Sequence, residues 1–242
     1  MQLYLLAYNS AFALGWAYCL ASGVGAVASV ASAASPSRPT LPALCAAFFG
    51  GAVPAARVLV LSCILETAHA ALGMVPSSPL TCFLQWWGRE NALFQVALAV
   101  PELRDGGHPA AAGMMLCWCA SEVIRYPWYA AGAADPARGP PRWLTWLRYS
   151  AFVPLYPLGV ACELWAIWAA LPALRRERRW SVQMPNAANF AFDYSVFISA
   201  MALLYPYLFW GQYSSLLRTR AKKLGSGGGG SRGRRGGDEK RE

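Results

Sequence analysis

Two residues of the segment LYPLGVACE, at positions 155 to 163, have the types and the spacing needed for proton transfer. Tyr156 and Glu163 are seven residues apart, so on an α-helix they differ by about 20° in direction and by about 10 Å in height. A phenol and a carboxyl group form an unlike pair that can move protons in both directions. Tyr149, another seven residues earlier, extends the same polar face. The pattern indicates a candidate acid–base site on one helix face.

The same spacing also fits a structural function. In that alternative, Tyr156 is an interfacial aromatic residue, and Glu163 pairs with Arg125 or Arg148 to hold two helices together. The spacing alone does not separate these two interpretations.

Long apolar runs must position these residues. Of the 242 residues, 56% are hydrophobic and 14% are charged, against roughly a quarter charged in soluble domains. A bilayer core of about 30 Å needs about 20 apolar residues as helix, and backbone in lipid must form its hydrogen bonds internally. We therefore expect an all-α, polytopic membrane helix bundle over residues 1–223, followed by a disordered, Gly-rich basic tail over 224–242. The expected spans are 4–32, 53–75, 81–101, 111–133, 147–172 and 191–216, with 41–52 lying at the interface before the second.

The formal net charge of +9 does not indicate a nucleic-acid partner. Nine of the 21 basic residues lie from Arg218 onward, and no nucleic-acid-binding motif accompanies them. Lys and Arg near the end of a span favour the cytoplasmic side and its anionic lipids. We expect membrane lipids as partners and both termini in the cytosol, although the run RRERR at 175–179 argues against this orientation.

Several ionisable residues interrupt the apolar runs. Inside a spanning helix each costs at least about 2.5 to 3.5 kcal/mol, so each is a candidate for pairing or for function. Glu66 and His69 are three residues apart, and a structural hydrogen bond between them is the favoured interpretation. Glu122 and Arg125 have the same spacing and can neutralise each other. Arg89 lies in the weakest of the six runs, whose polar residues are expected to face the bundle interior.

Two familiar kinds of site are not supported by the sequence. The second histidine, His108, lies in a loop, and the seven cysteines include no CxxC pair, so we expect neither a metal site nor disulfides. Cys119 and Arg125 have the Cys-x5-Arg spacing of cysteine phosphatases. No glycine lies between them, however, and the stretch is patterned as a helix rather than as a phosphate-binding loop.

Five islands of sequence together resemble the very-long-chain (3R)-3-hydroxyacyl-CoA dehydratase family, also called protein tyrosine phosphatase-like. They are YLLAYN at 4–9 with Trp16, LETAHAALGMVPS at 65–77, SEVIRYPWY at 121–129, LRYSAFVPLYPLGVACE at 147–163 and MPNAANFAFDY at 184–194. The resemblance covers nearly all of residues 1–223. It implies six transmembrane helices enclosing an acyl-chain tunnel in the endoplasmic reticulum membrane. It also implies a hydro-lyase that converts a (3R)-3-hydroxyacyl-CoA to the trans-2-enoyl-CoA and water, the third step of fatty acid elongation.

The resemblance also implies functions for individual residues. The family's catalytic Tyr and Glu, in the motif LYPxGxxxE, correspond to Tyr156 and Glu163. Elimination needs a base for the proton alpha to the thioester and an acid for the departing hydroxyl. We assign Glu163 as the base and Tyr156 as the proton donor, with the opposite assignment open. The residues expected to bind the substrate or to support this pair are Arg125, Tyr126, Tyr149, Glu66, His69 and Arg89.

The resemblance implies no cofactor, because the substrate itself carries CoA. The anionic nucleotide of CoA is expected to meet Arg89, Arg142 or Arg148 at the cytosolic mouth. Elongase, ketoacyl-CoA reductase and enoyl-CoA reductase are the expected protein partners. The chain departs from the family pattern at the N-terminus, which has no long cytosolic leader, and at Pro127, which is expected to kink its span.

Two alternatives come from other classes of protein. One is a catalytically inactive membrane scaffold of the elongase complex, against which the presence of both Tyr156 and Glu163 argues. The other is a small transporter, for which inverted repeats are typical, and the sequence shows no such internal symmetry.

Overall fold

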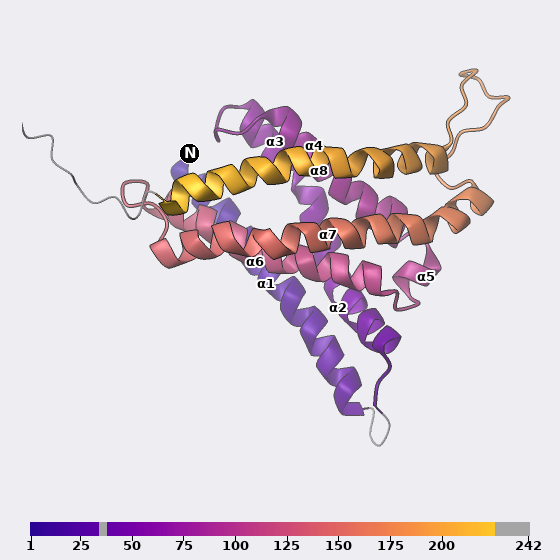
Figure 1. Ribbon diagram of the computed structural model, residues 1–242, viewed down its shortest axis with the longest axis horizontal. Coiled ribbons are helices and arrows are strands. Elements are labelled where there is room, and N and C mark those ends of the chain that lie inside the picture. The colour runs from indigo at the N-terminus through magenta and orange to yellow at the C-terminus, as the bar shows by residue number, and fades with distance from the viewer. Residues whose placement is uncertain (34–37, 226–242) are drawn as a thin grey trace, which may run out of the picture.

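A computed structural model describes residues 1–33 and 38–225 of this chain (Figure 1). Within these residues every regular element is a helix, and extended backbone pairs only in an isolated bridge between Val182 and Phe192. The prediction of an all-α fold is therefore confirmed. In chain order the elements are α1 (Gln2–Ala33), α2 (Leu41–Ser62), α3 (Ile64–Ala71), α4 (Pro79–Glu90), the π-helix η1 (Asn91–Ala97), α5 (Pro101–Arg104), α6 (Pro109–Ala134), α7 (Arg142–Glu177) and α8 (Tyr194–Gly225).

Four helical segments of the described chain are long and apolar enough to cross a membrane. They are Gln2–Ala33, Leu41–Ala71, Arg142–Glu177 and Tyr194–Leu224. Large apolar side chains such as Leu14 and Leu203 point outward from them, as expected of a surface that faces lipid. The α4–η1 pair and α6 occupy the other two expected runs, but they carry charged residues, among them Arg89 and Glu122, which lower their hydropathy.

Several prolines lie inside helices without ending them. Residues 41–52 were expected as a separate interfacial segment, but they form the first half of α2, which continues through Pro54. That expectation is wrong, because a proline removes only one backbone hydrogen bond, and neighbouring helices compensate for it in a bundle. The Thr40 hydroxyl caps the start of this helix by accepting from the Ala43 N–H at 3.4 Å. Likewise, α6 runs unbroken through Pro127.

The C-terminal boundary also differs from the expected one. Helix α8 extends to Gly225, so residues 224 and 225, which were expected in the tail, are helical and follow the basic last turn. The rest of the expected tail, 226–242, lies outside the described residues.

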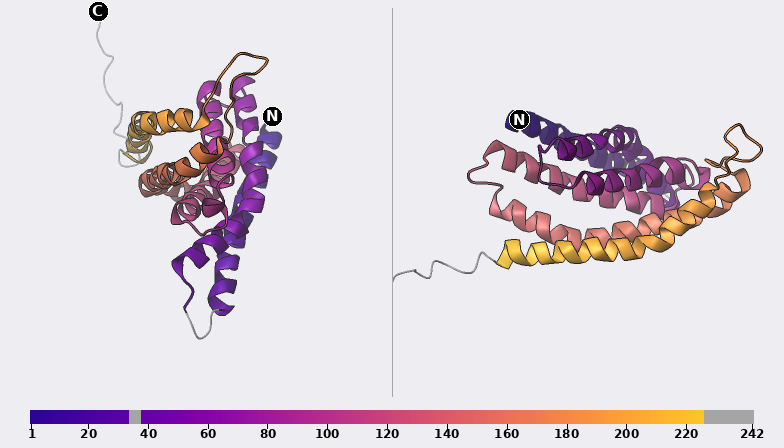
Figure 2. Two further views of the ribbon diagram at one scale, coloured as in Figure 1. Left: turned by 90° about the vertical axis from the view of Figure 1, so that its right-hand side faces the viewer. Right: turned by 90° about the horizontal axis from the view of Figure 1, so that it is seen from above.

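The long helices pack in the order α2, α1, α6, α7 and α8, with α4 and η1 against α2, α3 and α7 (Figure 2). Helices α7 and α8 lie side by side and run in opposite directions. The N-terminal end of α1, the turn between α6 and α7 and the C-terminal end of α8 share one end of the bundle (Figures 1 and 2). Both ends of the described chain therefore lie at the same end of the bundle.

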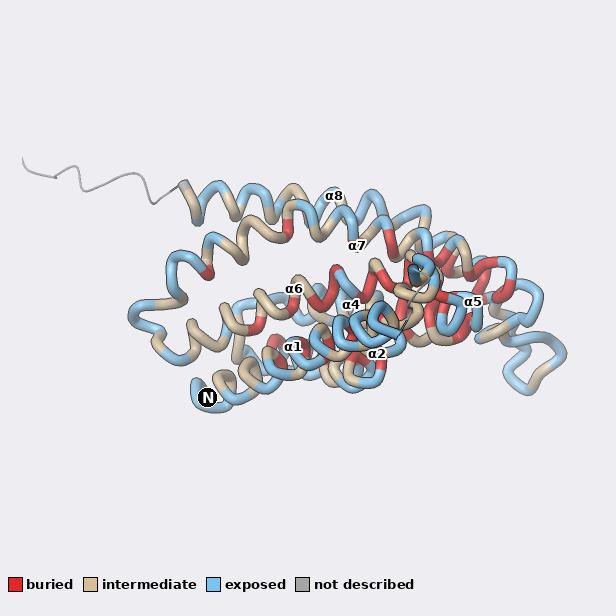
Figure 3. Tube along the Cα trace, turned by 90° about the horizontal axis from the view of Figure 1, so that it is seen from below, coloured by how far each residue is buried: buried red, intermediate tan, exposed pale blue. Residues whose placement is uncertain are grey.

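Small residues bring α6 and α7 close together. A Cβ added at Gly113 would lie 2.7 Å from the Cys162 sulfur, and one at Gly159 would lie 3.5 Å from the Cys117 Cβ. Such small-residue contacts let helix backbones approach closely in membranes. Buried positions concentrate on α6 and on the C-terminal half of α7, whereas α8 is mostly exposed (Figure 3).

Candidate active site

The carboxylate of Glu163 is held between three helices. Its Oε1 accepts a hydrogen bond from the indole N–H of Trp118 on α6 at 2.8 Å. Its Oε2 accepts a hydrogen bond from the hydroxyl of Tyr205 on α8. Glu163 itself lies on α7, which places the carboxylate at the seam where α6, α7 and α8 meet.

Tyr156 lies two helical turns before Glu163 on the same helix. Since α7 is continuous from Arg142 to Glu177, the two side chains leave it in directions about 20° apart. The Tyr156 ring packs edge-on against Phe152, with 6.0 Å between ring centroids. Its hydroxyl forms no hydrogen bond within the described residues. The arrangement leaves one phenol free to donate, on the face that also presents the carboxylate.

Tyr149, the third residue of the expected polar face, faces α6. Its ring lies 6.0 Å from that of Trp128 in an edge-on arrangement. Trp128 in turn donates from its indole N–H to the Thr145 hydroxyl at 3.1 Å. Tyr149 therefore belongs to the packing between α6 and α7, one turn after Thr145.

Neither of the cations suggested as structural partners of Glu163 contacts it. The guanidinium of Arg125 is engaged by two other carboxylates, at 2.6 Å from Glu122 and 3.0 Å from Glu66. Among the described residues Arg148 forms no ion pair. Glu163 therefore does not hold two helices together through a salt bridge to Arg125 or Arg148.

Four charged residues form a cluster, which consists of the carboxylates of Glu66 and Glu122 and the guanidiniums of Arg89 and Arg125. Arg125 donates through Nε to Glu122 and through both terminal nitrogens to Glu66. Arg89, from α4, lies 2.5 Å from the other oxygen of Glu122. The Tyr126 hydroxyl donates to Glu66 at 2.6 Å. The predicted pairing of Glu122 with Arg125 is confirmed, and the opposite charges balance inside the bundle.

His69 has a different partner from the expected one. Its Nε2 lies 2.8 Å from the hydroxyl of Tyr4 on α1, and its ring packs edge-on against Tyr8. The expected hydrogen bond to Glu66 does not form, because the carboxylate of Glu66 is occupied by Arg125 and Tyr126. His69 thus links α3 to the N-terminal turn of α1.

Arg89 lies inside the bundle and not at the end where the other candidate CoA-binding cations lie. Its guanidinium stands over the ring of Trp118, 5.5 Å from the centroid, while it pairs with Glu122. Arg89 thereby connects the charge cluster to the residue that donates to Glu163.

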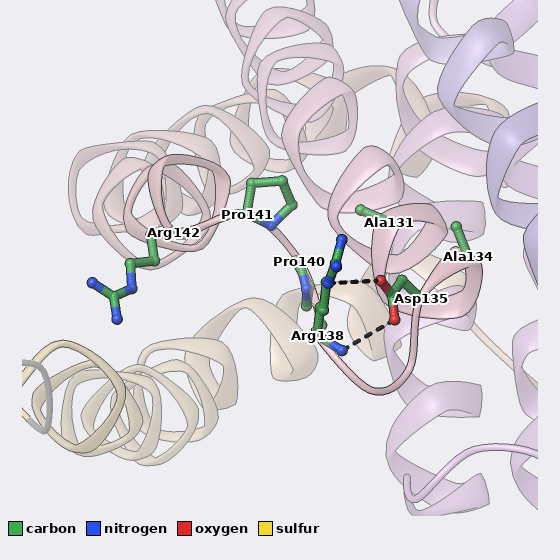
Figure 4. Close-up of a pocket in the computed structure, with 8 residues that line it drawn as sticks. Ala131, Ala134, Asp135, Arg138, Pro140, Pro141 and Arg142 are labelled. Carbon is green, nitrogen blue, oxygen red and sulfur yellow. Dashed lines mark hydrogen bonds and ion pairs between the residues drawn. The ribbon is translucent and has the colours of Figure 1, made fainter.

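Arg142 borders an open cavity of about 490 Å³ at the turn between α6 and α7, together with Arg138 and Asp135 (Figure 4). Arg138 turns towards Asp135, whereas the Arg142 side chain points away from that pair. A second, apolar cavity of about 260 Å³ lies between α2 and α6 and includes Phe48 and Gly113. Neither of these two cavities is lined by Tyr156 or Glu163.

Sequence reasoning missed Trp118 and Tyr205. For Trp118 a signal was present, since Trp118, Glu122 and Arg125 follow one another at helical spacing on one face of α6. For Tyr205 no local signal exists. It lies in an apolar helix with several other tyrosines, and only the packing of α8 on α7 brings it to Glu163.

The fold and the site define an all-helical protein with four helical segments long and apolar enough to cross a membrane and a carboxylate held by hydrogen bonds between helices. The sequence profile of the protein tyrosine phosphatase-like protein family, PTPLA, matches residues 60–226, and the chain belongs to this family. The Cys119-x5-Arg125 stretch lies within the continuous helix α6, as predicted, and forms no phosphate-binding loop. All seven cysteines lie within the described residues as free thiols.

Curated relatives carry dehydratase names. The chain is 34% identical over 161 residues to mouse very-long-chain (3R)-3-hydroxyacyl-CoA dehydratase 2, which is 66% of this chain and 61% of the relative. It is 29% identical over 228 residues to rice very-long-chain (3R)-3-hydroxyacyl-CoA dehydratase PASTICCINO 2B, covering 91% of this chain and 96% of the relative. The first of these matches thus spans about three-fifths of the relative's length. Comparison with solved structures gives no match.

Proposed function

We propose that this protein is a very-long-chain (3R)-3-hydroxyacyl-CoA dehydratase that eliminates water to give the trans-2-enoyl-CoA. The proposal rests on two side chains that share one face of α7. The Glu163 carboxylate is fixed by two hydrogen bonds, and the Tyr156 hydroxyl forms none within the described residues. The names of the curated relatives support the same reaction and an acyl-CoA substrate.

The geometry favours Glu163 as the base and Tyr156 as the proton donor. Each oxygen of the Glu163 carboxylate accepts one hydrogen bond and keeps a lone pair for the proton at C2 of the substrate. The Tyr156 hydroxyl is free to donate to the hydroxyl at C3. As the C2–H bond breaks, its electron pair forms the C2–C3 double bond and the C3–O bond breaks, and the protonated leaving group departs as water. Return of the proton from Glu163 to Tyr156 restores the site.

The remaining candidate residues are proposed as supports of this pair. The Glu66 carboxylate accepts hydrogen bonds from Arg125 and Tyr126. These bonds attach α3 to α6, the helix that bears Trp118. Tyr149 packs α7 on α6, and His69 anchors α1. Arg142 and Arg148, near the end of the bundle that carries both described chain ends, are the proposed contacts for the CoA nucleotide.

The cellular setting is part of the proposal. We place the protein in the endoplasmic reticulum membrane with six spans, adding α4–η1 and α6 to the four apolar segments. An acyl-chain tunnel would start at Glu163, and both termini would be cytosolic. Successive long helices alternate in direction, and both ends of the described chain lie at the same end of the bundle (Figure 1). Both features support an even number of spans. Membrane lipids surround the bundle, and elongase, ketoacyl-CoA reductase and enoyl-CoA reductase are the proposed partners. The proposed reaction uses no cofactor.

The test is an assay of the purified protein in liposomes with a long-chain (3R)-3-hydroxyacyl-CoA, following enoyl-CoA formation. Glu163→Gln and Tyr156→Phe should each lower kcat by about 10²-fold or more, as expected for the loss of an acid or base. Tyr129→Phe, on an exposed face of α6, is the control. If the wild type forms no enoyl-CoA, the inactive-scaffold alternative replaces the proposal. If both variants match the wild type, the site assignment is wrong.

A further inference from the structure

Both oxygens of Glu163 are occupied by donors from helices other than its own. Trp118 on α6 donates to Oε1 at 2.8 Å, and Tyr205 on α8 donates to Oε2. Neither donor lies in the segment 155–163 that contains the proposed catalytic pair. A carboxylate on a helix that crosses a membrane requires such donors, because lipid cannot stabilise its charge.

We propose that Trp118 and Tyr205 are positioning residues for the Glu163 carboxylate, an inference that rests on the proposed dehydratase function. One donor on each oxygen fixes both the position and the plane of the carboxylate. The remaining lone pairs then point in one fixed direction, towards the proton that Glu163 removes. Fixing a base in this way lowers the barrier because the correct orientation is present before the substrate binds.

The Trp118 side chain is itself held in place. The guanidinium of Arg89 stands 5.5 Å from the centre of the indole ring and is paired with Glu122 at 2.5 Å. Glu122 follows Trp118 by four residues, so both project from the same face of α6. Arg89 therefore covers the indole face, and Trp118 is 4% exposed. The indole ring of Trp118 therefore connects the cluster of charged residues to Glu163.

The contact of Tyr205 with Glu163 also attaches α8 to α7. Helix α8 is the least buried of the four apolar segments, with 17% of its most apolar window buried. A second tyrosine on the same helix, Tyr213, donates to the backbone carbonyl of Val153 on α7 at 3.0 Å. If the Tyr205 hydroxyl merely attached α8 to α7, loss of either hydroxyl would have the same effect.

Tyr213 therefore provides a matched control. Tyr205→Phe and Tyr213→Phe each remove one hydroxyl and one hydrogen bond from α8 to α7. Of the two, Tyr205→Phe alone removes a hydrogen-bond donor to the Glu163 carboxylate. Trp118→Phe keeps an aromatic ring beneath Arg89 and removes the N–H donor. The protein is assayed in liposomes with the same 3-hydroxyacyl-CoA, and kcat and KM are determined separately for each variant.

Tyr205→Phe and Trp118→Phe should each lower kcat by about 10- to 100-fold and leave KM within about twofold, the pattern of an interaction that acts in the transition state. Tyr213→Phe should change kcat by less than about twofold. Equal losses in Tyr205→Phe and Tyr213→Phe would overturn the proposal in favour of helix attachment. Wild-type kcat in Tyr205→Phe and Trp118→Phe, with Glu163→Gln inactive, would overturn it and leave the proposed function intact. Full activity of Glu163→Gln would overturn this proposal together with the assignment of Glu163 as the base, whereas an inactive wild type would overturn the proposed function.

Discussion

Arg89 on α4 and Glu122 on α6 form an ion pair of 2.5 Å inside the bundle, and the Glu122 side chain has no exposed surface. The other oxygen of Glu122 contacts Arg125 at 2.6 Å. One buried carboxylate thus bridges two guanidiniums, and Glu66 supplies the second negative charge through its contact with Arg125. The ion pair with Arg89 joins α4 to α6, the helix that carries Trp118.

Glu122→Gln should destabilise the protein strongly. The substitution leaves Arg89 without an anionic partner in the interior, and breaking a buried ion pair by removing one partner costs about 3 to 5 kcal/mol. The measurement is the thermal unfolding midpoint in detergent. Glu102→Gln, at an exposed position of α5, is the control and should leave the midpoint unchanged. Equal midpoints for the wild type and Glu122→Gln would show that the ion pair does not stabilise the fold.

Tyr126→Phe should have a smaller effect on stability. The Tyr126 hydroxyl, in a fully buried side chain, donates to Glu66 at 2.6 Å and accepts from Arg125 at 2.8 Å. Hydrogen bonds to charged groups contribute about 1.5 to 3 kcal/mol, so the free energy of unfolding should fall by that amount. Tyr129→Phe, one turn later and 38% exposed, serves as the comparison. Chemical denaturation of both variants in detergent distinguishes them, and an equally small change in both would contradict the expectation.

The helices and the face of the proposed catalytic pair were predictable from the sequence. Long apolar runs define helices that cross a membrane, and a spacing of seven fixes the common direction of Tyr156 and Glu163 once α7 is helical. The contact of Glu122 with Arg125 follows from their separation of three on α6. These features depend only on local geometry.

The partners that cross between helices were not predictable in the same way. Tyr205 meets Glu163 only because α8 packs on α7 in one register, and His69 meets Tyr4 across 65 residues of chain. The register depends on side-chain packing along whole helices, which one sequence does not reveal. The extent of α2 was misjudged because residues 41–52 were assigned to a separate interfacial segment, whereas the helix begins at Leu41 and continues through Pro54.

Asp193→Ala should loosen the start of α8. The Asp193 Oδ1 accepts from the Ser195 N–H at 2.8 Å, from the Ser195 hydroxyl at 2.7 Å and from the Val196 N–H at 3.2 Å. It therefore caps the N-terminus of the helix, and loss of such a cap costs about 1 kcal/mol. Hydrogen exchange of the first turn of α8 should become faster. Asp193→Asn keeps a capping oxygen and should exchange as the wild type does. Unchanged exchange in Asp193→Ala would show that other contacts determine the helix start.

Gly113→Ala should disturb both stability and activity. The added Cβ would lie 2.7 Å from the Cys162 sulfur, closer than side chains approach in folded proteins. Overpacking of this kind costs about 1 to 3 kcal/mol. Because Cys162 directly precedes Glu163, the displacement of α7 should also move the carboxylate away from Trp118. The thermal unfolding midpoint and kcat should both fall.

Cys162→Ala provides the rescue. Without the sulfur, the nearest atom to a Cβ at Gly113 is the Cβ of residue 162 at 3.8 Å, an ordinary contact. The double variant Gly113→Ala/Cys162→Ala should therefore recover midpoint and kcat relative to Gly113→Ala alone, with a coupling beyond the sum of the single changes. Gly50→Ala on α2, where no atom lies within 4 Å of the new Cβ, controls for the loss of a helical glycine and should not destabilise the protein. Additive effects of the two single substitutions would show that the contact between α6 and α7 at Gly113 does not position Glu163.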